Sequence, residues 1–272
     1  MKTLFEIMPG DLEPGSCNLT CELAGDLFCF TLENEEQHLF SGVALYQFEQ
    51  EDPDPVAALE ALLERQPLLK NRFARTCIVF SGPESVLIPF SLYSSLENSN
   101  VLNLVHGDLT NNDLVQTDLV SEAGVYNAYR IPRQLDVFLA KNFPGAEKTH
   151  LYSSLLKGQQ PENILLVILY PERFTVLLRA ENRTRLIQTY TYAGVTDVSY
   201  TLLNLSRTFG VPDIPVTISG LVDRDSALYK EIYQYFTSVT LAALPDHYQY
   251  SDAIREHPAH YFSHVFALAS CG

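Results

Sequence analysis

Basic residues are scarce in this chain, which has 18 Lys and Arg against 33 Asp and Glu and a formal net charge of −15. Nucleic-acid backbones and anionic membrane surfaces both select for basic faces, so neither is expected as the main partner. Long apolar runs are missing too, and no stretch reaches the roughly 18 apolar residues of a membrane span. Glu6 and Pro9 interrupt the N-terminal segment, which therefore lacks the apolar core of a secretory signal. We expect a cytoplasmic protein whose acidity serves solubility.

Cysteines are few and odd in number: Cys17, Cys21, Cys29, Cys77 and Cys271. The count is odd, and Cys29 and Cys77 lie in apolar strand-like runs, which favours a compartment in which cysteines stay reduced. Cys17 and Cys21 have no second close pair, so a structural zinc site is not expected.

Local catalytic signatures are missing as well. The chain has no Walker loop, no G-x-S-x-G elbow, no H-E-x-x-H and no G-x-G-x-x-G. We therefore assign no catalytic residue, no metal ligand and no cofactor from local motifs.

The second half contains a regular series of elements. An apolar run at 163–170 predicts a buried strand, and 174–179 and 186–192 predict two more. Asp197 is the expected N-cap of the helix that follows, which ends at Gly210, and 216–220 predicts a fourth strand. The order is strand, strand, strand, helix, strand.

The first half repeats this order after an irregular lead-in to Gly15. Strands are predicted at 19–23, 27–32 and 38–48, and a fourth at 76–82. Between them, Asp54 can cap a helix that begins at Pro55 and ends before Pro67. Two copies of one order favour an ancient duplication, although any α/β protein can offer such a series.

Additional elements fill the space between the two series. We expect a short helix at 90–96, a hairpin at about 113–131 and a helix from Pro132. The lobes are then 1–157 and 158–272, and the last helix, from Pro258, is expected to cross back onto the first lobe.

The series resembles the actin-like ATPase fold, a duplicated ribonuclease H-like α/β architecture with three antiparallel strands beginning each sheet. The resemblance also uses 86–89, after the first Ser-Gly turn, and the turn at Ser219 and Gly220. It extends to FtsA and PilM, and to a bacterial family of unknown function with this fold that is distantly similar to PilM. A member that binds nucleotide holds it between its lobes, with an Asp-x-Gly type turn in each.

Those turns are degraded here. The first, at 22–26, keeps Gly25 and Asp26 but has no aspartate at the expected spacing, and the second, at 169–173, has Pro171 in place of a donor. Arg173 could reach a phosphate, although a solvated arginine is the commoner case. The adenosine-side turn has Leu221 where a second glycine is usual. No cofactor is therefore predicted, and the weak candidates for a cleft between the lobes are Gly25, Asp26, Arg173, Ser219 and Gly220.

Two further groups of residues invite a functional interpretation. His257, His260 and His264 recur at helical spacing and could bind a metal, but we favour a surface stripe. Asp223 and Asp225 could bind a cation, but a solvated loop and a helix cap are more usual.

Tyrosines are concentrated in the second half, and tyrosine is favoured at protein interfaces, although half-buried positions explain most of them equally well. The sequence therefore favours a non-catalytic, pseudo-ATPase interaction or assembly module with an unknown protein partner, and it leaves homodimer formation open. The alternative is a divergent ATP-dependent phosphotransferase or ATPase with a rebuilt phosphate site, and a small-molecule sensor is a third option.

Overall fold

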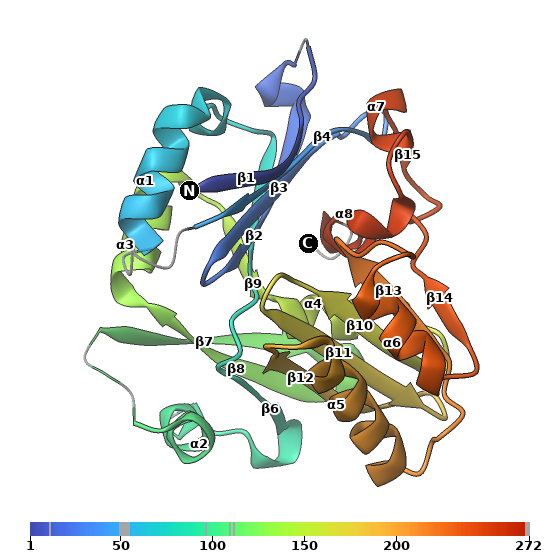
Figure 1. Cartoon of the computed structure of the whole chain (residues 1–272). Helices are drawn as coiled ribbons and strands as arrows, with labels where there is room; N and C mark the ends of the chain where they lie inside the picture. The colour runs from blue at the N-terminus through green and yellow to red at the C-terminus, as the bar shows by residue number, and fades with distance from the viewer. Residues whose placement is uncertain (11, 49–54, 96, 109, 111, 270–272) are drawn as a thin grey trace. The chain divides into compact units, whose positions relative to one another are not determined.

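The computed structural model describes residues 1–10, 12–48, 55–95, 97–108, 110 and 112–269. The chain forms two compact units (Figure 1). Unit 1 contains Met1–Lys157, Asp246–Glu256 and the residues from Leu268, and unit 2 contains Gly158–Pro245 and His257–Ala267. Each unit is built on its own sheet. No helix in the described part of the chain is both long and apolar enough to cross a bilayer.

The main sheet of unit 1 is organised around β2, which pairs antiparallel with β3 and parallel with β5. The strand order is β1-β4-β3-β2-β5-β9, and β15 pairs with β4. The strands are β1 (Lys2–Ile7), β2 (Cys17–Ala24), β3 (Leu27–Asn34), β4 (Leu39–Gln47), β5 (Arg75–Phe80), β9 (Glu147–His150) and β15 (Gln249–Tyr250).

Two helices of unit 1, α1 (Pro55–Arg65) and α3 (Arg133–Asn142), share a hydrophobic core with this sheet. They lie side by side (Figure 1). Leu59 and Leu62 of α1 and Leu139 of α3 are buried because apolar residues recur at helical spacing. Helix α1 begins at the predicted Pro55, and the predicted cap Asp54 lies outside the described residues.

A three-stranded sheet completes unit 1, in the order β6 (Ser85–Pro89), β8 (Val125–Pro132), β7 (Asp113–Val120). The antiparallel pairing of β7 with β8 is the hairpin that the alternating pattern predicts. Leu102 of α2 (Asn98–His106) packs on Ile88 and Ala128 of this sheet. Six of the seven residues of α4 (Leu151–Lys157) are buried.

Unit 2 has the strand order β12-β11-β10-β13-β14. Its strands are β10 (Ile164–Leu169), β11 (Arg173–Ala180), β12 (Arg183–Thr191), β13 (Val216–Gly220) and β14 (Val239–Leu241). Strand β10 is antiparallel to β11 and parallel to β13, as β2 is to β3 and β5 in unit 1. The predicted series is therefore present in both units, and the duplication that it suggests stays a prediction.

The helices of unit 2 show how local capping fixes an end. Helix α5 (Val195–Thr208) begins before the predicted cap, because the Asp197 carboxylate accepts hydrogen bonds from the backbone N–H groups of Ala193 and Gly194, both at 2.9 Å. Gly194 is the N-cap, and Asp197 at the third helical position supplies the one side-chain contact of a capping box that a glycine cap allows. Helix α6 (Ala227–Tyr235) is capped by Ser226, whose hydroxyl accepts from the Tyr229 N–H at 3.2 Å.

Three sequence-based expectations were wrong. The N-terminal lead-in contains β1, which forms a strand because it pairs with β4. Since this edge strand is only partly buried, its sequence does not show the periodicity of a strand. The described part of the predicted helix at 90–96 contains a single turn, Phe90–Leu92. The helix lies further on as α2, in which only Asn98 and Leu102 are buried. The last helix, predicted from Pro258, is broken into a turn at Ala259–Tyr261 and α8 (Ser263–Ala269), and the short helix α7 (Asp252–Arg255) precedes it.

Partly buried polar groups join β7 to β9 within unit 1. The Asp118 carboxylate accepts from the Thr149 hydroxyl at 2.9 Å and from the His150 N–H at 2.8 Å. The His150 ring is 1% exposed, and its Nδ1 accepts from the Tyr152 N–H at 3.1 Å. Its Nε2 therefore carries the proton and donates to the Gly82 carbonyl oxygen at 3.0 Å. Burial lowers the pKa of His150 to about 4.

This lowered pKa predicts a loss of stability in acid. Below pH 6.5 His150 is protonated in the unfolded chain, whereas in the folded protein it stays neutral until the pH falls to about 4. This residue contributes up to about 3 kcal/mol to the free energy of unfolding above pH 6.5, and the contribution disappears as the pH falls towards 4. Urea unfolding of His150→Gln, which keeps a donor but cannot titrate, should show a shallower decline in this window. A decline as steep as that of the wild type would contradict the assignment.

The four described cysteines, Cys17, Cys21, Cys29 and Cys77, are all buried and free. Burial raises the pKa of the Cys21 and Cys29 thiols, so both are held as unreactive thiols. Cys271 lies outside the described residues.

Candidate functional site

A pocket of 460 Å³ lies in unit 1, where β2 and β5 end. These strands run parallel, and Leu23 pairs with Phe80, so the turns that follow them meet at one edge of the sheet. Gly25, at φ 45°, and Asp26 form the first turn, and Gly82 follows the second strand. The carboxyl edge of parallel strands is where ligands bind in open α/β sheets. This pocket is therefore the candidate site of unit 1.

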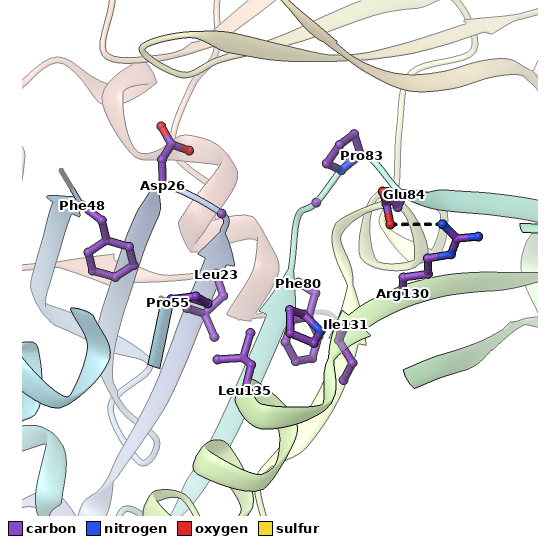
Figure 2. A pocket seen from close by; sticks show the side chains of 13 residues that line it. Leu23, Asp26, Phe48, Pro55, Phe80, Pro83, Glu84, Arg130, Ile131 and Leu135 are labelled. Carbon is purple, nitrogen blue, oxygen red and sulfur yellow. Dashed lines mark ion pairs between the residues drawn. The ribbon is translucent and has the colours of Figure 1, made fainter. Parts of the chain in front are cut away.

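Apolar side chains line the interior of the pocket. Leu23, Phe80, Ile131 and Leu135 lie along its floor (Figure 2), and all four are buried members of the hydrophobic core of unit 1. A surface of this kind suits an apolar group rather than a phosphate, whose oxygens need donors or cations.

Charged residues lie at opposite sides of the pocket. Asp26 is on one side, and Glu84 and Arg130 form an ion pair on the other at 3.6 Å (Figure 2). The Arg130 guanidinium also donates to Asn103 Oδ1 at 2.8 Å and to the Gly107 carbonyl oxygen. Arg130 is the one cationic residue among the described lining residues, and these three partners already engage it. The pocket therefore offers little attraction to a triphosphate.

The corresponding turn of unit 2 is filled by its own side chains. Strand β10 leads into Tyr170 and Pro171, and the Tyr170 N–H donates to the Arg173 carbonyl oxygen at 2.9 Å. The Tyr192 hydroxyl donates to the Tyr170 carbonyl oxygen at 2.7 Å. Both backbone groups of Tyr170 are thus satisfied within the protein, and neither is presented to a ligand.

Arg173 is not the solvated turn arginine that the sequence favours. It is 9% exposed, and its guanidinium carbon lies 4.8 Å from the centre of the Tyr170 ring. A cation over an aromatic face is attracted by the ring electrons. Sequence reasoning missed this contact because Tyr170 and Arg173 face each other only once the turn has formed.

Ser219 and Gly220 lie beside the same turn. The Ser219 hydroxyl is buried and forms hydrogen bonds with the Ser263 hydroxyl at 2.7 Å and His264 Nδ1 at 2.9 Å. The His264 ring meets the Tyr170 ring edge-on at 5.7 Å between centres. Gly220 adopts φ 112°, and a Cβ placed on it would lie 2.1 Å from the Leu169 carbonyl oxygen. The unit-2 candidates Arg173, Ser219 and Gly220 therefore gather around Tyr170, and their contacts hold the turn closed.

The histidines also differ from the expected surface stripe. His260 is buried, and its Nε2 forms a hydrogen bond with the Val222 carbonyl oxygen at 2.7 Å. His264 holds Ser219, and His257 is exposed. The break between Ala259–Tyr261 and α8 explains the difference, because the three residues do not share one helix face. The described residues contain no group of three or more His, Cys, Asp or Glu that could hold a metal ion.

The acidic pair at 223 and 225 has a structural partner. The Tyr261 hydroxyl donates to the Asp223 carboxylate, so Asp223 is not a simple solvated loop residue. Ser226, rather than Asp225, caps α6.

A family model described as a protein of unknown function, DUF3822, matches residues 11–239. The chain belongs to the DUF3822 family. No curated protein matches it. Three solved structures show how far the likeness of this DUF3822 chain to known folds extends.

A Bacteroides thetaiotaomicron VPI-5482 protein with an actin-like ATPase fold and unknown function is similar, with a TM-score of 0.77 and 15% identity over 97% of this chain and 100% of that one. A chain of the PilM–PilN type IV pilus biogenesis complex gives a TM-score of 0.63 and 11% identity over 95% of this chain and 98% of that one. The ethanolamine utilization protein EutJ from Carboxydothermus hydrogenoformans gives a TM-score of 0.51 and 10% identity over 97% of this chain and 93% of that one.

These likenesses show the fold of the DUF3822 chain. The predicted actin-like α/β architecture, with three antiparallel strands beginning each sheet, is confirmed. So is the resemblance to a family of unknown function with distant similarity to PilM.

Sequence reasoning missed much of the unit-1 pocket in this DUF3822 chain. It singled out Gly25 and Asp26 from the turn but not Glu84, Arg130 or Leu135. Those three come from a loop, a hairpin strand and a helix, and the pairing of β8 with β6 helps to bring Arg130 and Leu135 to the end of β5. No local motif marks them.

Glycine should matter at 220 far more than at the corresponding position 82. Gly220→Ala would place a Cβ against the Leu169 backbone at a φ that L-residues rarely adopt, so we expect a loss of at least about 2 kcal/mol in unfolding free energy. Gly82→Ala meets nothing within 4 Å and should change stability by less than about 0.5 kcal/mol. Denaturant unfolding of both variants provides the comparison, and equal stability of the two would refute the close-approach argument.

Proposed function

We propose that this DUF3822 protein is a non-catalytic member of the actin-like fold that binds another protein as an interaction or assembly module in the cytoplasm. The observation that carries the proposal is the turn after β10. An active member needs glycine and donors there, whereas this chain has Pro171, the Tyr170 ring and the buried Arg173.

Each lost phosphate contact lowers the affinity for a triphosphate further. Each charge-assisted hydrogen bond to a phosphate contributes about 1.5–3 kcal/mol, so losing several removes most of the affinity. In unit 2 the backbone groups of Tyr170 bond within the protein, and in unit 1 the pocket has apolar walls and a cation already engaged by Glu84. Each turn thus offers few phosphate contacts, and for a different reason.

Exposed tyrosines that suit a protein partner lie on two packed helices of unit 2, and we call them the tyrosine surface. Tyr200 of α5 is 72% exposed, and Tyr233 and Tyr235 of α6 are 61% and 51% exposed. Helices α5 and α6 pack together, and the Ser199 hydroxyl of α5 donates to the Glu231 carboxylate of α6 at 3.2 Å. Tyrosine provides a large contact area with one polar end, which suits an interface. The fold shared with a chain of the PilM–PilN complex adds support by analogy.

Nucleotide binding gives the first test. Isothermal titration calorimetry with Mg·ATP should show no binding heat, and millimolar Mg·ATP should leave the melting temperature within about 1 °C. A site with a Kd near 10 μM would instead stabilise the fold by about 2.7 kcal/mol at 1 mM ligand, and the melting temperature would rise by several degrees. Such a rise would overturn the non-catalytic assignment.

The tyrosine surface gives the second test. Tyr200→Ser with Tyr233→Ser should reduce capture of a cross-linked partner from the native host by more than tenfold, because exposed aromatic anchors carry much of an interface's energy. The matched control is Leu104→Ser with Val137→Ser, which removes exposed apolar side chains from unit 1. Light scattering shows whether the partner is a second copy. Equal capture by both variants and the wild type would remove this surface from the proposal.

One observation favours the alternative of a divergent ATPase. Gly25 keeps a positive φ, and Asp26 stands at the mouth of a pocket where β2 and β5 end. ATP turnover by purified protein that disappears in Asp26→Ala would favour this alternative.

A further inference from the structure

A second groove of unit 1 lies at the amino-terminal ends of β5 and β9, at the other end of β5 from the pocket of Figure 2. It has a volume of 630 Å³. Two segments form its walls, residues 70–76 and residues 142–145 with Glu147, and we call it the cationic groove.

Both walls of the cationic groove are anchored in the core of unit 1. Phe73 in the first wall and Phe143 in the second are buried, and Leu69 fixes the turn that leads into the first. Arg75 and Glu147 join the walls through two hydrogen bonds, at 2.7 and 3.3 Å. The groove is therefore held in shape without a ligand, which lowers the cost of binding.

The charge of the groove is opposite to that of the protein. Lys70, Arg72 and Arg75 line it, and Glu147 is the single acidic residue among its described lining residues. Glu147 pairs with Arg75, whereas Lys70 and Arg72 are exposed and have no ion-pair partner among the described residues. On a chain with a net charge of −15, two uncompensated cations beside a preformed groove make a local site for an anionic group.

The backbone favours spaced carboxylates over a single phosphate. Phosphates are usually held by converging N–H donors. Here the N–H groups of Asn71 and Ala74 already donate to the carbonyl oxygens of Leu68 and Cys17, and that of Ala146 donates to Phe143. The long side chains of Lys70 and Arg72 are donors that remain exposed at the groove. The exposed rim of the groove is polar, with Lys70, Asn71 and Arg72, whereas small-molecule sites are lined mainly by apolar side chains.

We propose that the cationic groove binds an extended segment of a protein partner that is rich in Asp and Glu. This inference rests on the proposed function, because it supplies a second contact for the same kind of partner. Lys70 and Arg72 contact the acidic side chains, and the Arg75–Glu147 pair keeps the walls in place.

The test uses the full chain and a fluorescein-labelled peptide of alternating glutamate and glycine, followed by fluorescence anisotropy. Binding should weaken as salt rises, because the contacts lie at the surface. Lys70→Glu with Arg72→Glu should weaken it by at least about tenfold, which corresponds to about 1.4 kcal/mol. Lys70→Gln with Arg72→Gln should give a smaller loss. Both changes are on exposed side chains, so an unchanged melting curve is expected as the folding control.

The matched control is Arg183→Glu with Arg224→Glu, which alters two exposed arginines of unit 2 and lowers the net charge equally. This variant should bind the peptide within about twofold of the wild type, because a local site rather than net charge governs binding. An equal loss in the control, no binding by the wild type, or displacement of the peptide by micromolar inorganic phosphate would each overturn the groove assignment. Partner capture that still depends on Tyr200 and Tyr233 would leave the proposed function standing in that case.

Discussion

Each unit depends on one strand that is hydrogen-bonded along both edges, antiparallel on one side and parallel on the other. In unit 2 this strand is β10, and all six of its residues are buried. In unit 1 it is β2, between β3 and β5. A parallel neighbour cannot follow through a tight turn and needs a crossover, which contains α1 in one unit and α5 in the other. The order strand, strand, strand, helix, strand is a consequence of this pairing.

The same pairing places the turn after each central strand beside the end of its parallel partner. At that edge the units diverge. Unit 1 leaves a pocket between Asp26 and the Glu84–Arg130 pair, floored by core side chains. Unit 2 fills the space with the Tyr170 ring, which has Arg173 on its face and His264 against it. The close approach of Gly220 to Leu169 belongs to this second solution, because any side chain there would push the strands apart.

The sequence predicted the elements whose burial pattern lies within one segment. It did not predict the features that depend on contacts between distant segments. An unbroken apolar run predicted β10, a proline predicted the start of α1, and alternation of apolar and polar residues predicted the β7–β8 hairpin. Each pattern follows from the burial of one segment. Strand β1 is a strand because β4 pairs with it, and the last predicted helix is broken where the His260 ring bonds to Val222. The sequence around Arg173 is typical of a turn, and its burial beside the Tyr170 ring arises only once the turn has folded. The lining of the unit-1 pocket was hidden for the same reason, since it joins residues from separate elements.

The contacts around Tyr170 stabilise the turn after β10 from within the protein. In a phosphate-binding turn, backbone N–H groups are left to the ligand, and an empty site leaves them to water. Here the Tyr170 N–H has the Arg173 carbonyl oxygen, the Tyr170 carbonyl oxygen has the Tyr192 hydroxyl, and Ser219 is held by Ser263 and His264. Each of these bonds contributes about 1 kcal/mol and needs no ligand. The turn is therefore stable as a piece of protein structure, and rebuilding it for a triphosphate would require breaking those bonds first. That cost is the physical basis for assigning binding to side chains on the surface of the units rather than to this turn.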